Sequence, residues 1–175
     1  MHKGVQVPNI TFHYRVRDAS IGGDNPFRWQ QVSSGDIFNH KKVVVFSLPG
    51  AFTPTCSTFQ VPGFEAAYEE IKSHGVDEVY VLSVNDTFVM RKWMLDQGVE
   101  NLSFIPDGAG EFTRQLGMLV DKSNIGFGLR SWRYAMVVDN GVIQHWLEEP
   151  GREDHHAADP YGVSSPESVL AALKG

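Results

Sequence analysis

The chain has 175 residues, of which 42% are hydrophobic and 21% charged, and its net charge is −6. This length suits one domain spanning residues 1–175, because chains of this size bury roughly 70% of their unfolded surface. The acidic balance and the lack of a basic run disfavour nucleic acid or an anionic membrane as a partner. No apolar stretch approaches the roughly 20 residues that a membrane-spanning helix needs. Cys56 is the single cysteine, so no internal disulfide can form, and we expect a cytoplasmic protein.

The first part of the chain is predicted to form a hairpin and then a buried strand. Apolar and polar residues alternate in its first strand, which is the period of a half-buried strand. A later run of consecutive apolar residues is typical of a central strand covered on both faces. The predicted elements are strands at 10–16, 27–32 and 43–47, a hairpin spanning 5–32, and a helical turn at 36–39 capped by Ser33 or Ser34.

A helix is predicted to follow the central strand. Thr53 suits its N-cap position and Pro54 its first helical position, where the missing N–H leaves no bond unmade. Pro62 and Gly63 should interrupt or kink the helix after about two turns. Strands and helices then alternate, which favours an α/β fold with a partly parallel sheet, helices on both faces and an antiparallel hairpin at one edge. The remaining predictions are helices at 64–73, 87–97, 110–116 and 167–173, strands at 76–84, 101–105, 134–138 and 142–147, an irregular segment at 120–128 and a polar loop at 148–161.

The lone thiol lies at the predicted start of a helix. The first amides of a helix have no internal partner and point outward, and with the helix dipole they favour negative charge. A thiolate is therefore favoured at Cys56, which makes this residue a candidate nucleophile. A lone cysteine is by itself more often a small buried apolar residue, but the surrounding Pro49 and Thr53 favour the functional interpretation.

The segment at 49–56, PGAFTPTC, resembles the active-site motif of the peroxiredoxins, in which Pro, three residues, Thr and two residues precede Cys. The longer run PGAFTPTCS, followed by PGF at 62–64, is similar to the fifth, or type II, subgroup. The resemblance covers essentially the whole chain. It implies a thioredoxin-like three-layer α/β/α sandwich with an N-terminal β-hairpin extension.

The resemblance also implies roles for particular residues. Cys56 would be the peroxidatic thiolate, which becomes a sulfenic acid. The hydroxyl of Thr53 would face the sulfur and the peroxide, and Pro49 would shield the pocket. Arg133, which directly precedes the strand beginning at Tyr134, would stabilise the thiolate and bind peroxide. Backbone N–H groups at the helix start would donate to the developing charge.

Three further positions are expected in the pocket or at an interface. Phe127 falls where the subgroup has an aromatic residue at the pocket mouth and dimer contact. Arg130 is a candidate for a supporting or purely structural role, and Gly50 belongs to the motif loop. Gln60 departs from the pattern, because the subgroup often has a histidine there and glutamine cannot titrate.

The resemblance implies a thiol-dependent peroxidase that reduces hydrogen peroxide and organic hydroperoxides. No resolving cysteine is present, and Ser164 and Ser165 occupy the region where some members carry one. Glutathione with glutaredoxin, or thioredoxin, is therefore expected as the reductant. A homodimer is expected, and no metal, haem or flavin cofactor. His155 and His156 lack regular metal-ligand spacing, so a solvated loop is the preferred interpretation there.

Three other functional classes fit the sequence less well. A non-enzymatic peroxide sensor or chaperone would use oxidation of Cys56 as a switch. A Cys–His hydrolase is disfavoured because no Gly-x-Cys-x-Gly elbow is present. A thioredoxin-like disulfide reductase is disfavoured because the chain has no Cys-x-x-Cys.

Overall fold

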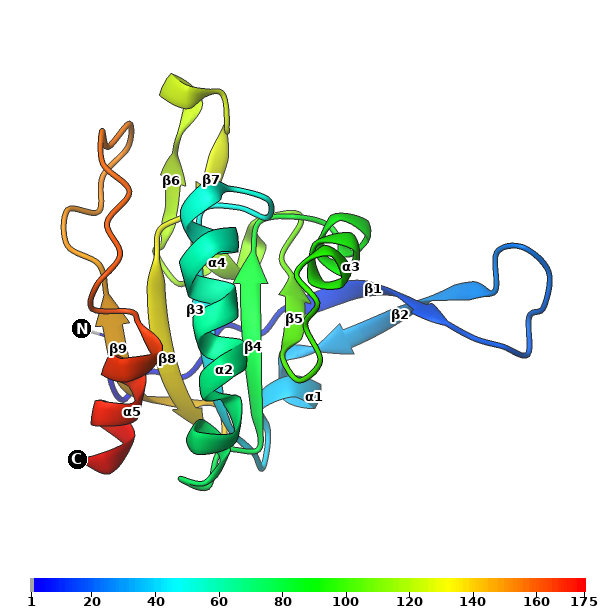
Figure 1. Cartoon of the computed structure of the whole chain (residues 1–175), viewed down its shortest axis with the longest axis horizontal. Helices are drawn as coiled ribbons and strands as arrows, with labels where there is room; N and C mark the ends of the chain where they lie inside the picture. Colours follow the sequence, from blue (N-terminus) through cyan, green and yellow to red (C-terminus); the bar gives the residue numbers. More distant parts are fainter. Residues whose placement is uncertain (1) are drawn as a thin grey trace.

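The computed structural model describes residues 2–175. Its centre is a five-stranded sheet with the order β5-β4-β3-β8-β9 (Figure 1). The middle strand is β3 (Lys42–Ser47), which pairs parallel with β4 (Glu78–Ser83) and antiparallel with β8 (Tyr134–Asp139). Successive apolar side chains of β3 enter two different core clusters, Phe46 in one and Val45 in the other. The prediction of a central strand covered on both faces is confirmed.

Helices cover both faces of this sheet and form the outer layers of a sandwich. On one face the rings of Phe46 and Phe64 stack with their centroids 4.0 Å apart. On the other face Phe38 and Phe112 stack at 6.1 Å. The predicted three-layer α/β/α arrangement is thus confirmed. The first face carries α2 (Val61–Lys72), α3 (Thr87–Asp96) and α5 (Pro166–Lys174), and the second carries α1 (Ser34–Phe38) and α4 (Glu111–Gln115).

The N-terminal extension is a long antiparallel hairpin that projects from the body of the protein (Figure 1). It consists of β1 (Thr11–Arg17) and β2 (Phe27–Ser33), as predicted. Ser33 then caps α1, because its hydroxyl accepts the N–H of Asp36 and the Asp36 carboxylate accepts the N–H of Ser33. The candidate cap at Ser33 is confirmed.

The remaining strands complete the edges. The hairpin of β8 and β9 (Val142–Glu148) is confirmed, and β5 (Ser103–Pro106) forms the opposite edge of the sheet. The irregular segment predicted at 120–128 is partly wrong. It begins in β6 (Leu119–Asp121), which pairs with β7 (Leu129–Ser131) around a short turn. Strands of three residues are too short to show a period of two in a sequence.

The helix that carries Cys56 is continuous, so the predicted interruption at Pro62 and Gly63 is wrong. A π turn, η1 (Cys56–Gln60), leads directly into α2, and the N–H of Val61 donates to the carbonyl of Cys56 five residues earlier. Proline has no N–H to continue an α register. The wider π turn shifts the register just before Pro62, which then occupies the first turn of α2.

None of the helices within residues 2–175 combines the length and apolar character required to span a membrane.

Candidate active site

Cys56 sits where the chain turns from β3 into the helix, and its side chain is fully buried. Thr53 directly precedes the first helical residue, and its carbonyl accepts the N–H of Ser57. The hydroxyl of Thr53 donates to the carbonyl of Gly50 at 2.7 Å. Thr53 therefore has the predicted cap position, while its hydroxyl braces the loop that precedes Cys56.

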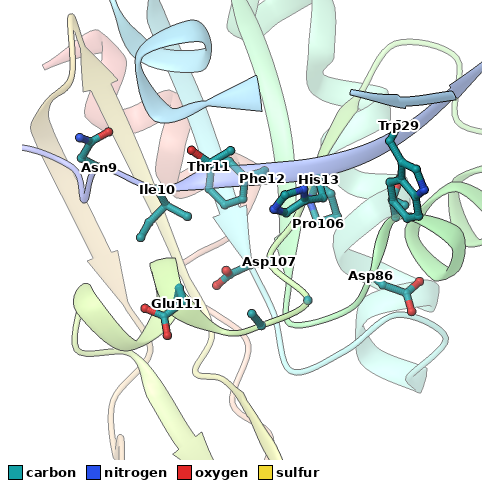
Figure 2. A pocket seen from close by; sticks show the side chains of 13 residues that line it. Asn9, Ile10, Thr11, Phe12, His13, Trp29, Asp86, Pro106, Asp107 and Glu111 are labelled. Carbon is teal, nitrogen blue, oxygen red and sulfur yellow. The ribbon is translucent and has the colours of Figure 1, made fainter. Parts of the chain in front are cut away.

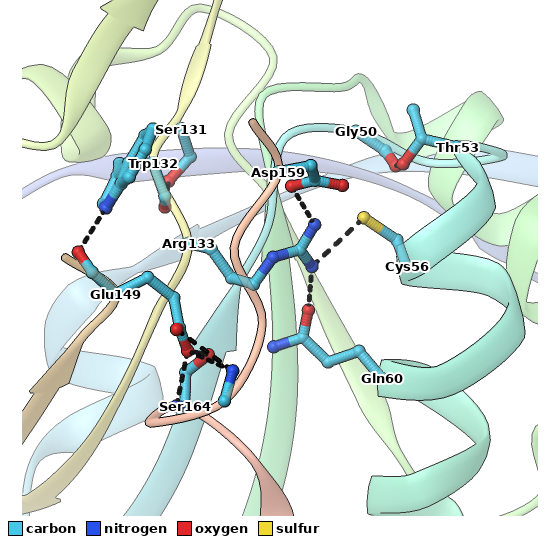
Figure 3. A network of polar contacts seen from close by, with 11 residues as sticks. Gly50, Thr53, Cys56, Gln60, Ser131, Trp132, Arg133, Glu149, Asp159 and Ser164 are labelled. Carbon is cyan, nitrogen blue, oxygen red and sulfur yellow. Dashed lines mark hydrogen bonds and ion pairs between the residues drawn. The ribbon is translucent and has the colours of Figure 1, made fainter. Parts of the chain in front are cut away.

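Arg133 reaches Cys56 from the residue before β8, as Figure 3 shows. Its guanidinium is 1% exposed, and its Nη1 donates to Sγ of Cys56 at 3.4 Å. The same Nη1 donates to Oε1 of Gln60, and Nη2 forms an ion pair with Oδ1 of Asp159 at 2.7 Å. The structure thus brings together the two residues, 77 positions apart, that the sequence singled out as the centre of the site.

The electrostatics keep Arg133 charged. Burial by itself lowers the pKa of this guanidinium, but Cys56 and Asp159 together more than offset that effect and leave the pKa above its usual value. A permanent positive charge therefore faces the sulfur. A charge that is shielded from water acts strongly on negative charge that develops beside it during a reaction.

Gln60, which stands where the subgroup often has a histidine, binds Arg133 in this structure. Its side chain is fully buried one helical turn beyond Cys56 and accepts from Arg133. Its Nε2 has no hydrogen-bond partner within residues 2–175. A carboxamide holds the guanidinium in the same way at every pH, since it does not titrate.

Asp159 and Glu149 were not predicted as parts of the site. The prediction that the loop at 148–161 is merely polar and solvated is wrong at these two residues. Asp159 is 44% exposed but turns its carboxylate inward to Arg133. Glu149 is buried and accepts the N–H groups of Gly162 at 3.0 Å and Ser164 at 2.7 Å, and the Ser164 hydroxyl at 2.6 Å.

Glu149 therefore ties the returning loop to the strand next to Arg133. Its own N–H donates to the carbonyl of Arg133 at 3.1 Å. The same residue thus fixes the backbone of Arg133 and the far end of the segment that carries Asp159 (Figure 3). Only one signal in the sequence could have suggested this role: the acidic pair Glu148 and Glu149 directly after the strand predicted at 142–147.

The other predicted pocket residues surround a cavity of about 210 Å³ beside the loop that precedes Cys56. Pro49, Thr53 and Phe127 line it. Arg130 donates from Nε to the carbonyl of Phe127 at 3.1 Å and covers Gly50, where an added Cβ would lie 2.8 Å from Nη1 of Arg130. A side chain at position 50 would push the end of the Arg130 side chain away from this loop. This space beside the loop of Cys56 is the thiol cavity.

A larger cavity of about 540 Å³ lies elsewhere, between β1 and the loop that follows β5 (Figure 2). Asp107 is the buried acid in its wall, and both of its oxygens are occupied by N–H or hydroxyl groups of Phe112 and Thr113. None of its lining residues belongs to the segment at 49–56 that ends in Cys56. The thiol cavity is smaller, but Pro49, Thr53 and Thr55 of that segment line it.

Titratable side chains outside the site form local pairs. His155 pairs with Asp121 at 3.3 Å, and His156 pairs with Glu153 at 2.9 Å. Within residues 2–175, no group of three or more histidine, cysteine or acidic side chains has an arrangement that could hold a metal ion.

Comparisons with known proteins agree with the geometry. Residues 3–160 match the family described as Redoxin. A peroxiredoxin of Rhizobium etli is 60% identical over 169 residues, which cover 97% of this chain and 94% of that protein. The hybrid peroxiredoxin hyPrx5 of Haemophilus influenzae is 46% identical over 171 residues, which cover 98% of this chain and 66% of that protein. The crystal structure of the Plasmodium falciparum antioxidant protein, a 1-Cys peroxiredoxin, is similar with a TM-score of 0.90 at 34% identity, covering 98% and 99% of the two chains.

The chain therefore belongs to the redoxin family and has its thioredoxin-like fold. Within that family it is a peroxiredoxin, a thiol-dependent peroxidase, and its single cysteine fits the one-cysteine form. The predicted resemblance to the fifth subgroup is confirmed.

Proposed function

We propose that this protein reduces hydrogen peroxide and organic hydroperoxides at Cys56, with Arg133, Thr53 and Pro49 as its other catalytic residues. The observation that carries the proposal is the contact of 3.4 Å between the buried Nη1 of Arg133 and Sγ of Cys56. A buried thiol in contact with a guanidinium is an arrangement that stabilises a thiolate, and the thiolate is the reactive form.

The first half-reaction is a displacement at oxygen. The Cys56 thiolate attacks one peroxide oxygen, so that an S–O bond forms and the O–O bond breaks. The second oxygen leaves with the bonding electrons and takes a proton to become water or an alcohol, while the sulfur is oxidised to the sulfenic acid. Arg133 and the amides at the helix start stabilise the charge that develops on oxygen.

The hydroxyl of Thr53 is oriented for one part of this step. Its proton is engaged with the carbonyl of Gly50. A hydroxyl has one proton and two lone pairs, so the oxygen of Thr53 is left to accept a hydrogen bond from the peroxide. Pro49 is buried in the loop beside it and excludes water from that side.

The second half-reaction requires a thiol from outside the chain, because the sequence contains no second cysteine. Attack of an external thiolate on the sulfenic sulfur gives a mixed disulfide, and a second thiol releases Cys56. Glutathione with glutaredoxin is the first candidate and thioredoxin the second. A reducing compartment such as the cytoplasm would supply either of them.

We also propose a homodimer, formed through the face near Phe127 and the loop around Cys56. Large apolar side chains are at least half exposed in these segments, which is common where a surface meets a partner. They are Phe52, Phe59, Ile125 and Leu129.

The test is peroxide consumption by the purified protein with glutathione plus glutaredoxin, or with thioredoxin. We expect turnover that is abolished in Cys56→Ser. Unimpaired turnover in that variant would refute the assignment. If Cys56 reacts with peroxide no faster than a free thiol, the peroxide-sensor or chaperone function is favoured instead.

A further inference from the structure

Lys122 carries an unneutralised charge in the wall of the thiol cavity. The residue follows β6 and is only 4% exposed. Its Nζ lies 5.6 Å from the centre of the Trp132 ring. Within residues 2–175 its side chain takes part in no ion pair or hydrogen bond, and Nζ is not among the fully buried unpaired atoms, so the ammonium is open to the cavity that the residue lines.

The rest of the cavity does not supply the missing negative charge. Asp159 is the carboxylate in the same wall, and Arg133 holds it at 2.7 Å. Arg130 beside Phe127 is a second cation without a carboxylate partner. The cavity is therefore locally positive in a chain whose net charge is −6, which makes it complementary to an anion.

The remaining titratable residue in the wall is His156, which is paired with Glu153 at 2.9 Å and packs edge-on against Trp132. His156 therefore supplies no negative charge to Lys122. The ammonium is thus the cation of this wall that is free to bind a ligand.

The size of the cavity limits the ligand to a small molecule. Its volume is about 210 Å³. Thr53 and Thr55, on either side of the start of the helix, line the same cavity as Lys122. A carboxylate and a few carbon atoms fit this space, and a folded protein does not enter it.

The occupant follows from the chemistry of the second half-reaction. Cys56 is fully buried and the chain has no other thiol. The thiol cavity is lined by Pro49, Thr53 and Thr55 of the segment that carries Cys56, so a small thiol bound there lies beside the loop of that residue. Hydrogen peroxide is neutral, so the reaction of Cys56 with it does not require the positive charge of Lys122 in addition to that of Arg133.

We propose that Lys122 binds the carboxylate of a low-molecular-weight thiol, such as glutathione, and so directs that thiol to the oxidised Cys56. The proposal rests on the proposed function and narrows its reductant to a small anionic thiol. Arg130 at the rim adds to the same attraction.

The step that Lys122 assists is the formation of the mixed disulfide. The thiolate of the small molecule attacks the sulfenic sulfur, an S–S bond forms and the S–O bond breaks. Hydroxide leaves and takes a proton to become water. The sulfur of Cys56 is reduced and the sulfur of the small thiol is oxidised by the same amount.

The test compares the rates at which oxidised Cys56 reacts with glutathione and with glutathione diethyl ester, in which both carboxylates are esterified and uncharged. The protein is oxidised with one equivalent of hydrogen peroxide and mixed with either thiol, and the adduct on Cys56 is followed by mass spectrometry of quenched samples. In Lys122→Met, which keeps the apolar stem, we expect the rate ratio of glutathione to ester to fall about tenfold, the factor that corresponds to 1.4 kcal/mol. Lys122→Arg should keep most of the preference. The intrinsic reactivities of the two thiols cancel when the ratios are compared.

Lys92→Met is the matched control, because Lys92 is exposed and paired with Asp96 at 2.8 Å. Its ratio should equal that of the native protein. The rate with hydrogen peroxide is measured separately in each variant and reports on folding and on the proposed peroxidase. If Lys122→Met reacts normally with peroxide but keeps the native ratio, the carboxylate site is overturned while the peroxidase stands. A second outcome also overturns the carboxylate site. In it, Lys122→Met reacts more slowly with a hydroperoxide that carries a carboxylate, but its rate ratio of glutathione to ester is native. The site would then bind the oxidising substrate and not the reducing thiol.

Discussion

Arg133 uses the geometry of its side chain to serve three partners at once. One nitrogen contacts Cys56 and Gln60, and the other contacts Asp159. A planar guanidinium can make these contacts together, whereas an ammonium is a compact charge on a flexible stem. The position therefore requires arginine for its shape as well as for its charge.

Arg133→Lys should accordingly react with hydrogen peroxide about 100-fold more slowly, the usual loss when one preorganised donor to a developing charge is removed. Stopped-flow fluorescence of the first half-reaction measures this rate. Arg114→Lys is the control, because Arg114 is exposed and paired with Glu111. A rate within twofold of the native value in Arg133→Lys would show that only the charge matters.

Gln60→Glu tests why an uncharged side chain occupies this buried position. The substitution keeps the shape but places a carboxylate against the guanidinium that contacts Cys56. A nearby like charge disfavours a second anion. The pH profile of the reaction with peroxide should therefore move to higher pH, with a lower rate at pH 7 and recovery in alkaline solution. An unchanged profile would mean that Arg133 screens the sulfur completely.

At the scale of elements, the loop that follows β9 depends on a single carboxylate. Glu149→Gln replaces a carboxylate that accepts from the N–H groups of Gly162, Val163 and Ser164 and from the Ser164 hydroxyl with a group that also donates. We expect about 1–3 kcal/mol of destabilisation, the cost of leaving buried donors unpaired. Urea unfolding measures the free energy, and hydrogen exchange should become faster at residues 162–164. Wild-type protection of these amides in the variant would contradict the anchoring role.

The sequence predicted the elements that have long, regular patterns and missed those that do not. The apolar run of β3, the cap at Ser33 and the alternation of β1 each follow from local rules. The π turn before Pro62 does not, because proline signals a break and the backbone can instead shift its hydrogen-bond register. Short strands such as β6 owe their pairing to tertiary contacts.

The same distinction holds for the candidate site. The residues of the motif around Cys56, together with Arg133, could be assigned to one pocket from the sequence, because a known family pattern links them. Asp159 and Glu149 act through a loop without periodicity, and only its folded path brings the first to Arg133 and the second to Ser164. Lys122 has no signal in the sequence, because burial and the lack of a partner are properties of the fold.

At the scale of the whole molecule, the free energy of unfolding should fall in acid because two groups, Glu148 and His145, both bind protons more weakly in the folded state. Burial tends to raise the pKa of Glu148, but hydrogen bonds from Trp146 and Arg152 more than offset this and lower it below its ordinary value of 4.5. A carboxyl with a depressed folded pKa stabilises the protein above the unfolded value, and the contribution is lost as the pH falls through the folded one. Burial, followed by Lys3 and Lys42, lowers the pKa of His145 below 6.5. The His145 imidazole then binds a proton more readily in the unfolded chain than in the folded one. The free energy of unfolding therefore also declines as the pH falls through the unfolded-state pKa near 6.5.

Urea unfolding between pH 3 and pH 8 separates the two contributions. The free energy of unfolding should rise with pH across the range from 3 to 7. Glu148→Gln should flatten the rise below pH 4.5 and leave the part near 6.5, and His145→Gln should do the reverse. Because the Glu148 carboxylate accepts from Trp146 and Arg152, while Arg133 contacts Cys56, Gln60 and Asp159, the Glu148 variant should keep the native rate with hydrogen peroxide. If Glu148→Gln and the native protein lose stability in parallel below pH 4.5, other carboxylates with lowered pKa values, such as the exposed Asp36 that accepts hydrogen bonds from Ser33, account for the acid response.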